Sequence, residues 1–149
     1  MPTATRARAD AVAMAARLRL SATRLARLLR QQAESGLTPS QLSVLATIEL
    51  RGPLTLGALA DHERVAPPSI TKVVGKLEDQ GLVRRQLHQT DRRVALVSMT
   101  EQGVALLAES RQRKNAWLAS RLAQLDGEQR ARLAGALDVL DAITTQEQA

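Results

Sequence analysis

The stretch from Pro67 to Met99 limits the possible folds of this chain more than any other. Its apolar residues recur three and four positions apart at first, which places one apolar stripe on a short helix. The stripe consists of Ile70, Val73, Val74 and Leu77. Gly81 suits the C-terminal cap of that helix, and two apolar-leaning strands joined by a polar turn run from Val83 to Met99. The pattern predicts a short helix followed directly by a β-hairpin.

Helical patterns precede this stretch. A long N-terminal helix, expected to end near Gly36, carries a heptad seam. The seam consists of Ala11, Ala15, Leu18, Ala22, Leu25 and Leu29. Thr38 and Gln41 form a capping box at the start of a second helix, and Thr55 caps a brief third one.

Two more helices are expected after the hairpin. Thr100 caps a long helix that runs towards Gln124, and Asp126 restarts the chain as a last helix. The apolar face of the last helix consists of Leu133, Leu137, Leu140 and Ile143. We therefore predict a mainly α fold with a small β-hairpin wing (α+β), a winged helix-turn-helix core flanked by long helices. The apolar seams of these flanking helices would be exposed in a single chain, so we expect them to be dimerisation helices.

Composition removes several classes of site. The 149 residues have the size of one domain and include no cysteine, which excludes disulfides, thiolate metal sites and cysteine nucleophiles. The apolar run from Ala11 to Ala16 is too short for a secretory signal, and the helical pattern continues past the arginine-rich start, which argues against a transit peptide. No run approaches the ~18 apolar residues of a membrane span. We expect a cytoplasmic protein with no membrane partner.

The positive charge of the chain is concentrated near the predicted hairpin. The net charge is +6, and 18 of the 21 basic residues are arginine, a balance that attracts nucleic acid, anionic lipid or acidic proteins. Between Arg64 and Arg93, seven basic residues stand against three acidic ones, so this region carries +4. A binding site for a polyanion is therefore expected there.

The face of the 67–80 helix opposite its apolar stripe is suited to nucleic acid. That face consists of Pro68, Thr71, Lys72, Gly75, Lys76 and Asp79. An α-helix fits the major groove of B-DNA, where lysine and threonine meet base edges or phosphates, and Gly75 lets another molecule approach the backbone. The helix starts without a capping side chain at Ala66, and we expect unpaired N–H groups at Ser69 and Ile70 that suit a phosphate. The alternative is an ordinary amphipathic surface helix with solvated lysines.

The turn of the hairpin carries Asp91, Arg92 and Arg93 in a row. Aspartate is a good turn former, but a turn has no need for two arginines. A wing beside a helix in the major groove meets the flanking minor groove, whose negative potential favours arginine. Asp91 can pair with the Arg93 guanidinium and restrain its direction, whereas Arg92 contacts either a phosphate or only solvent. The alternative is a solvated Asp–Arg contact on a loop.

The segment from Leu59 to Gly103 resembles the DNA-binding core of the MarR family, the multiple-antibiotic-resistance regulators. The resemblance is carried by the run SITKVVGKLEDQGLVRR, the Asp-x-Arg signature at Asp91 and Arg93, and the exit VSMTEQG. It implies that Arg93 enters the minor groove and that Asp91 orients it. The recognition-helix residues that it implies are Pro68, Ser69, Thr71, Lys72 and Lys76.

The resemblance also implies an organisation and a function. The organisation is a single MarR-like domain, 1–149, with a winged helix-turn-helix over 38–99 and dimerisation helices over 6–36 and 100–146. The function is that of a homodimer that binds pseudo-palindromic operators in double-stranded DNA, usually as a repressor. Members of the family often release DNA when a small anionic or phenolic effector binds between the dimerisation and DNA-binding regions.

Some residue types that members of this family use are missing from the chain. Without cysteine it cannot sense oxidants through a thiol, and His62 and His88 alone do not form the histidine cluster of a zinc sensor. Trp117 is the single aromatic residue, which argues against a pocket that stacks on a phenolic effector. For an anionic effector, arginines would supply most of the polar contacts. No cofactor or metal is expected, and the effector-binding residues stay unassigned.

Two other classes of function remain as alternatives. An enzyme is disfavoured, because the chain has no Gly-rich phosphate loop, no nucleophile motif and no metal-ligand spacing. The second alternative is a helical adaptor that uses its winged helix to bind protein or RNA without operator recognition. The basic wing tip argues against a purely protein partner.

Overall fold

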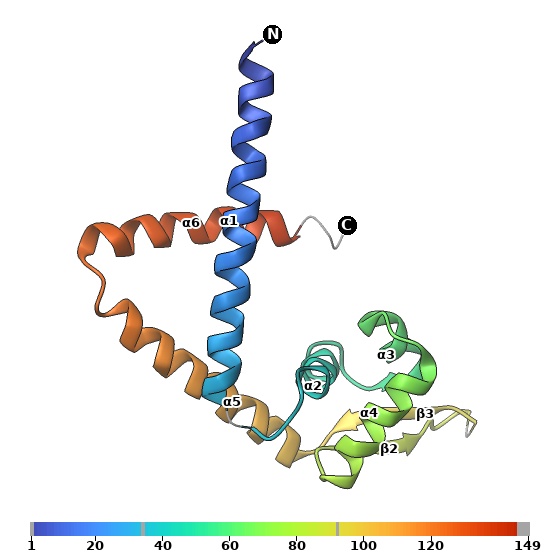
Figure 1. Cartoon of the computed structure of the whole chain (residues 1–149). Helices are drawn as coiled ribbons and strands as arrows, with labels where there is room; N and C mark the ends of the chain where they lie inside the picture. Colours follow the sequence, from blue (N-terminus) through green and yellow to red (C-terminus); the bar gives the residue numbers. More distant parts are fainter. Residues whose placement is uncertain (1, 34, 92, 146–149) are drawn as a thin grey trace.

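The computed structural model describes residues 2–33, 35–91 and 93–145. The helices in this part are α1 (Pro2–Ala33), α2 (Pro39–Arg51), α3 (Leu56–Glu63), α4 (Pro67–Asp79), α5 (Glu101–Leu122) and α6 (Gly127–Thr145). The strands are β1 (Leu54–Thr55), β2 (Val83–Leu87) and β3 (Ala95–Met99). Figure 1 shows α1, α5 and α6 as an open frame on one side, with the winged-helix elements gathered on the other. The predicted fold class is confirmed.

The predicted helix starts are present, each with its cap. The Thr38 hydroxyl accepts a hydrogen bond from the Gln41 N–H (3.2 Å), and the Gln41 side chain accepts one from the Thr38 N–H (3.0 Å). Thr55 and Thr100 cap α3 and α5 in the same way, each accepting from a backbone N–H three residues on (3.1 Å). Local sequence therefore determines where these helices begin.

The sheet contains one more strand than the predicted hairpin. Its order is β1-β3-β2, and both pairings are antiparallel. In the hairpin, Val83 lies opposite Met99 and Leu87 opposite Ala95, as the predicted span requires. Strand β1 joins the other edge of β3, with Leu54 opposite Val97. Two residues are too few to show the alternation that identifies a strand in a sequence, so the pairing of β1 was not predicted.

One apolar core holds the winged helix together. Its largest fully buried side chains are Leu45, Leu59, Ile70, Leu77, Val44, Val74 and Val97. They come from α2, α3, α4 and β3, and Val83 of β2 is buried in the same core. Leu107 of α5 completes the core, and the start of α5 packs closely on the chain before β2. A Cβ atom at Gly103 would lie 2.2 Å from the Leu82 carbonyl oxygen, so this approach requires glycine.

The end helices bury very little. In α1 the described buried residue is Ala33, and α6 has none. Helix α1 ends at Ala33 and α5 at Leu122, slightly earlier than predicted, and Asp126 caps α6 by accepting from the Gln129 N–H (2.7 Å). None of the described helices has both the length and the apolar character to cross a membrane.

Candidate nucleic-acid interface

Helix α4 exposes the face that was predicted to meet DNA. Ile70, Val74 and Leu77 are buried against the core, which directs the other side of the helix to solvent. The exposed residues of that side include all five predicted recognition residues, Pro68, Ser69, Thr71, Lys72 and Lys76. Nothing lies within 4 Å of the position that a Cβ atom at Gly75 would take. The face is thus open to a bound molecule along its length.

The start of α4 differs from the expectation in its hydrogen bonds. Ala66 provides no side-chain cap, as predicted, but its carbonyl oxygen accepts from the N–H groups of Ser69 (2.9 Å) and Ile70 (3.3 Å). The expectation of two unpaired N–H groups there was wrong, because a tight first turn pairs both of them within the helix. The exposed side chains, rather than these N–H groups, are what α4 offers to a ligand.

The end of α4 leads directly into the wing. Gly81 has φ +74°, and its N–H bonds to the Glu78 carbonyl oxygen (2.9 Å) while the Leu82 N–H bonds to that of Leu77 (3.0 Å). These two bonds form a Schellman motif, and the predicted role of Gly81 is confirmed. The Thr100 hydroxyl donates to the Gly81 carbonyl oxygen (2.6 Å), which ties this corner to the start of α5.

The wing tip spans residues 88–94 and closes with main-chain bonds. The His88 N–H bonds to the Val94 carbonyl oxygen (2.8 Å), and the Val94 N–H bonds to that of Asp91 (3.1 Å). Asp91 and Arg93 are both exposed at the tip. Arg92, also predicted to be part of this site, lies outside the described residues.

Asp91 restrains Arg93 differently from the prediction. The Asp91 carboxylate accepts a hydrogen bond from the Arg93 backbone N–H (3.0 Å), and the ion pairs between described residues do not include one with the Arg93 guanidinium. An aspartate that bonds the backbone two residues on forms an Asx turn. Asp91 therefore orients the backbone of Arg93 and does not engage the guanidinium of that residue.

Two further arginines of the wing hold the hairpin in place. The Arg85 Nε lies 3.1 Å from a carboxylate oxygen of Glu78, which joins β2 to the last turn of α4. The Arg84 Nε donates to the Ser98 hydroxyl (3.4 Å) across the β2–β3 pair. Sequence reasoning counted these two residues only as positive charge, because the contacts depend on how the hairpin folds back on α4.

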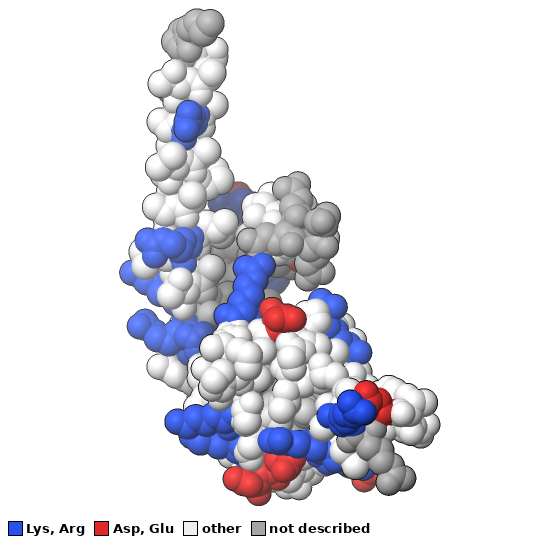
Figure 2. All heavy atoms as spheres, turned by 90° about the vertical axis from the view of Figure 1, so that its right-hand side faces the viewer, with Lys and Arg blue, Asp and Glu red and all other residues white. Residues whose placement is uncertain are grey.

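Figure 2 shows Lys and Arg side chains over the winged helix and in a second group along α1. Acidic side chains are interspersed over the winged helix. In the described part of the chain, no cluster of three or more His, Asp or Glu side chains is placed to hold a metal ion. The chemistry that this surface offers is that of cations, hydroxyl groups and a helix face.

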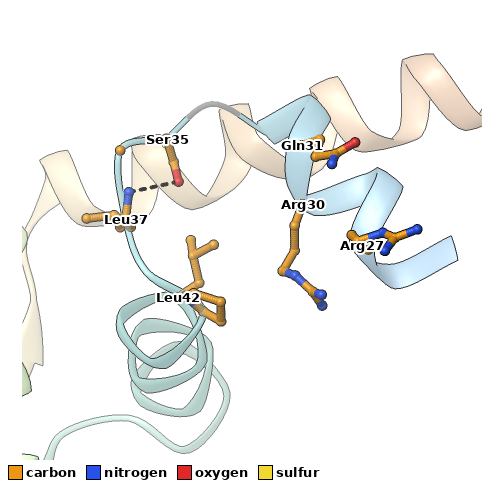
Figure 3. Close-up of a pocket in the computed structure, with 8 residues that line it drawn as sticks. Arg27, Arg30, Gln31, Ser35, Leu37 and Leu42 are labelled. Atoms are coloured by element: carbon orange, nitrogen blue, oxygen red, sulfur yellow. Dashed lines mark hydrogen bonds between the residues drawn. The ribbon is translucent and has the colours of Figure 1, made fainter. Parts of the chain in front are cut away.

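A pocket of about 290 Å³ lies between the end of α1 and the start of α2. It is lined by Arg27, Arg30, Gln31, Ser35, Gly36, Leu37, Pro39 and Leu42. In Figure 3 the Arg30 side chain extends from α1 into the space beside Leu42 of α2. The pocket brings two arginines of the first helix next to apolar side chains of the winged helix. Sequence reasoning did not select these arginines from the seven along α1.

Comparison with known proteins identifies the class to which this arrangement belongs. A profile of the MarR family matches residues 37–95, the winged helix. An uncharacterised HTH-type transcriptional regulator of Mycobacterium bovis, Mb0904, is 42% identical over 134 residues, which are 89% of this chain and 94% of that protein. The chain belongs to the MarR family. The relatives that it matches are named as HTH-type transcriptional regulators, which supports the prediction of a non-enzyme at the level of the family.

Solved structures agree with this MarR assignment. A transcriptional regulator of Pseudomonas aeruginosa matches with a TM-score of 0.81 and 32% identity, covering 91% of this chain and 96% of that one. A mutant of MepR from S. aureus bound to an oligodeoxyribonucleotide matches with a TM-score of 0.70 and 18% identity, covering 87% of this chain and 96% of that one. The second likeness is one of fold. The fold of this MarR-family protein therefore occurs in a structure that holds DNA.

Proposed function

We propose that this MarR-family protein is a homodimeric repressor that binds pseudo-palindromic double-stranded DNA. The observation that carries the proposal is that the exposed face of α4 and the basic wing project from a single buried core. An α-helix with lysine and hydroxyl side chains fits the major groove, and an arginine-bearing wing beside it reaches the flanking minor groove. Lys72, Lys76, Ser69 and Thr71 would contact bases or phosphates, and Arg93 would enter the minor groove.

The end helices support the dimeric part of the proposal. Leu18, Leu25, Leu133 and Leu137 are each 39% to 52% exposed in the single chain. A hollow of about 210 Å³ between α5 and α6 is lined almost entirely by apolar atoms, Leu122, Leu133, Ala134 and Leu137 with the Arg130 stem. Apolar surface of this extent is a mark of an interface. A second copy would bury it and set two recognition helices ~34 Å apart, about one turn of DNA.

The pocket between α1 and α2 is our candidate for an effector site. Its arginines would bind the negative group of a small ligand, and Leu37 and Leu42 would contact an apolar body. Because the pocket joins a dimerisation helix to the winged helix, a ligand there would change the angle between the two. Such a change alters the spacing of the recognition helices and releases the operator. A repressor of this kind acts in the cytoplasm, where its DNA is.

The experiment that tests the DNA-binding proposal is selection of bound duplexes from a random library. We expect recovery of a pseudo-palindrome whose half-sites lie about 10 bp apart. Affinity for that duplex should fall with salt, with a log–log slope near −0.9 for each phosphate contact. Failure to bind any duplex at low salt, together with binding to RNA or to a protein, would identify the chain as an adaptor instead.

The wing assignment has its own test. Arg93→Ala should weaken binding to the selected duplex by about 5- to 150-fold, because the loss of one DNA-contacting arginine costs about 1–3 kcal/mol. The melting temperature should stay the same, since Arg93 is exposed and outside the recorded ion pairs of the described residues. Wild-type affinity in this variant would contradict the assignment. A suitable control is Arg8→Ala, at the far end of α1.

A further inference from the structure

The turn between α3 and α4 has a residue in an unusual conformation. Arg64 has φ 54° and ψ 44°, in the left-handed region, and is the single non-glycine residue with positive φ among those that the structure describes. In this region the Cβ atom of an L-residue crowds the following carbonyl oxygen, so glycine is favoured there. Arginine at this position therefore adopts a backbone conformation that is unfavourable for it.

The same motif occurs twice in the winged helix, with different residues at the key position. At the end of α3, the Arg64 N–H bonds to the Asp61 carbonyl oxygen (3.2 Å) and the Val65 N–H to that of Ala60 (3.1 Å). This repeats the Schellman motif that ends α4, where Gly81 takes the left-handed position. The geometry at Arg64 is thus one that glycine provides without strain elsewhere in this chain.

Contacts within the chain do not account for the arginine. Arg64 is exposed, and the three ion pairs of the described residues involve other arginines. The neighbouring Glu63 carboxylate is turned to α2, where it accepts hydrogen bonds from the hydroxyl groups of Ser43 and Thr47, both 2.7 Å long. None of these contacts involves the Arg64 guanidinium, so they give it no part in stabilising the fold.

The position of Arg64 relates it to the recognition helix. It lies three residues before Pro67, the first residue of α4, so the two Cα atoms are at most ~11 Å apart. In a helix-turn-helix the N-terminal part of the recognition helix reaches the base edges, which brings the preceding turn to the phosphates at the edge of the groove. Phosphate is the ligand that an exposed guanidinium at this edge recognises best.

We infer that Arg64 binds a backbone phosphate of the duplex beside the N-terminus of α4, and that the left-handed cap presents its side chain for this contact. The inference rests on the proposed binding of double-stranded DNA and adds a residue that was not assigned to the interface. A phosphate contact positions a protein on DNA and carries no base preference. Arg64 should therefore contribute affinity equally on the selected and on unrelated sequences.

The test uses the full chain and three substitutions at this one position. Arg64→Gly removes the guanidinium and relieves the backbone, Arg64→Asn removes it while tolerating the left-handed region, and Arg64→Lys keeps a positive charge. Binding is measured on the selected duplex and on a random duplex at several salt concentrations, with Arg8→Ala as the matched control. Thermal unfolding is measured at equal protein concentration.

We expect Arg64→Gly and Arg64→Asn to lower affinity for both duplexes by about eight-fold per contact at 0.1 M salt, with a salt slope shallower by ~0.9 per contact. Arg64→Lys and Arg8→Ala should keep most of the affinity. Arg64→Gly should also raise the melting temperature, by about 2–4 °C, because the strain at the cap is removed. A rise in stability together with a loss of binding is a combination that a purely structural residue would not produce.

Two results would overturn the inference. The first is wild-type affinity and salt slope in Arg64→Gly. The second is a lower melting temperature in that variant, which would give Arg64 a role in the fold. Failure of the proposed function has a different signature, because the wild-type chain and Arg8→Ala would then bind neither duplex.

Discussion

The winged helix and the end helices of this protein use apolar residues in opposite ways. In the winged helix, Leu45, Leu59 and Leu77 are fully buried within a single chain. In α1 and α6, Leu25 is 41% exposed and Leu137 is 52% exposed. The winged helix has a buried apolar core, to which α5 adds Leu107, whereas α1 and α6 carry apolar seams that this chain leaves partly exposed. The difference agrees with the proposed dimer, in which the winged helix is held by contacts within one chain and a second chain would cover the seams of the end helices.

The largest effect is expected from a charge placed on the apolar seam of an end helix. Leu137→Glu should abolish dimerisation, since an unpaired carboxylate in an apolar interface costs several kcal/mol. Sedimentation should then show a species of one chain's mass, while the circular dichroism of the winged helix is retained. Asp138→Ala, at an exposed neighbouring position, serves as control and should stay dimeric. A dimeric Leu137→Glu variant would show that α6 is not at the interface.

A methyl group at Gly103 should lower the stability of the winged helix, because the start of α5 packs against Leu82 there. Gly103→Ala places a Cβ atom against the Leu82 carbonyl oxygen, 2.2 Å away before relaxation. The backbone must shift, and we expect a loss of about 3 kcal/mol in the free energy of unfolding. Chemical denaturation measures it. If the loss in the free energy of unfolding is no larger than that of an ordinary substitution within a helix, the start of α5 does not pack on Leu82 as described.

Lys72→Ala should leave both regions intact and weaken DNA binding. If Lys72 reads a base edge, the loss is about 1–3 kcal/mol and specificity is relaxed at one position of the operator. If the loss is equal on all sequences and the salt slope becomes shallower by about 1, Lys72 contacts a phosphate instead. Competition between the selected duplex and single-base variants separates these results. No loss on any duplex would remove Lys72 from the interface.

Gly75→Ala should change stability only slightly, and in the direction opposite to that of Gly103→Ala. The position is open, so alanine should stabilise α4 by about 0.5–1 kcal/mol through its higher helix propensity. If DNA approaches the backbone there, the same variant binds the operator more weakly. Denaturation and binding assays on one preparation compare the two effects. Unchanged affinity would show that this part of α4 does not come close to DNA.

Local features of the sequence predicted much of the fold. The capping box at Thr38 and Gln41, the cap at Thr100 and the positive φ of Gly81 depend on residues within a few positions, and all three are present. The apolar stripe of α4 likewise determines which face is buried, because a helix has a fixed period. From that stripe follows the exposure of the five predicted recognition residues.

Features that depend on distant residues were missed. Strand β1 is a strand because β3 lies beside it, and two residues carry no periodic signal of their own. The contact between Arg85 and Glu78 exists only after the hairpin has folded back on α4. At the wing tip the spacing of Asp91 and Arg93 was read as a contact between side chains, but the carboxylate bonds the backbone N–H. An Asx turn satisfies the same spacing, and it does not require the long arginine side chain to be held in one rotamer.

Both regions must act together if the protein is a dimeric DNA-binding regulator. The most direct test is sedimentation of the protein with the duplex recovered by selection, which measures how many chains bind one site. We predict two chains on one duplex, and no intermediate with a single chain at protein concentrations that maintain the dimer. One chain on each duplex, or no complex with any duplex at low salt, would contradict it.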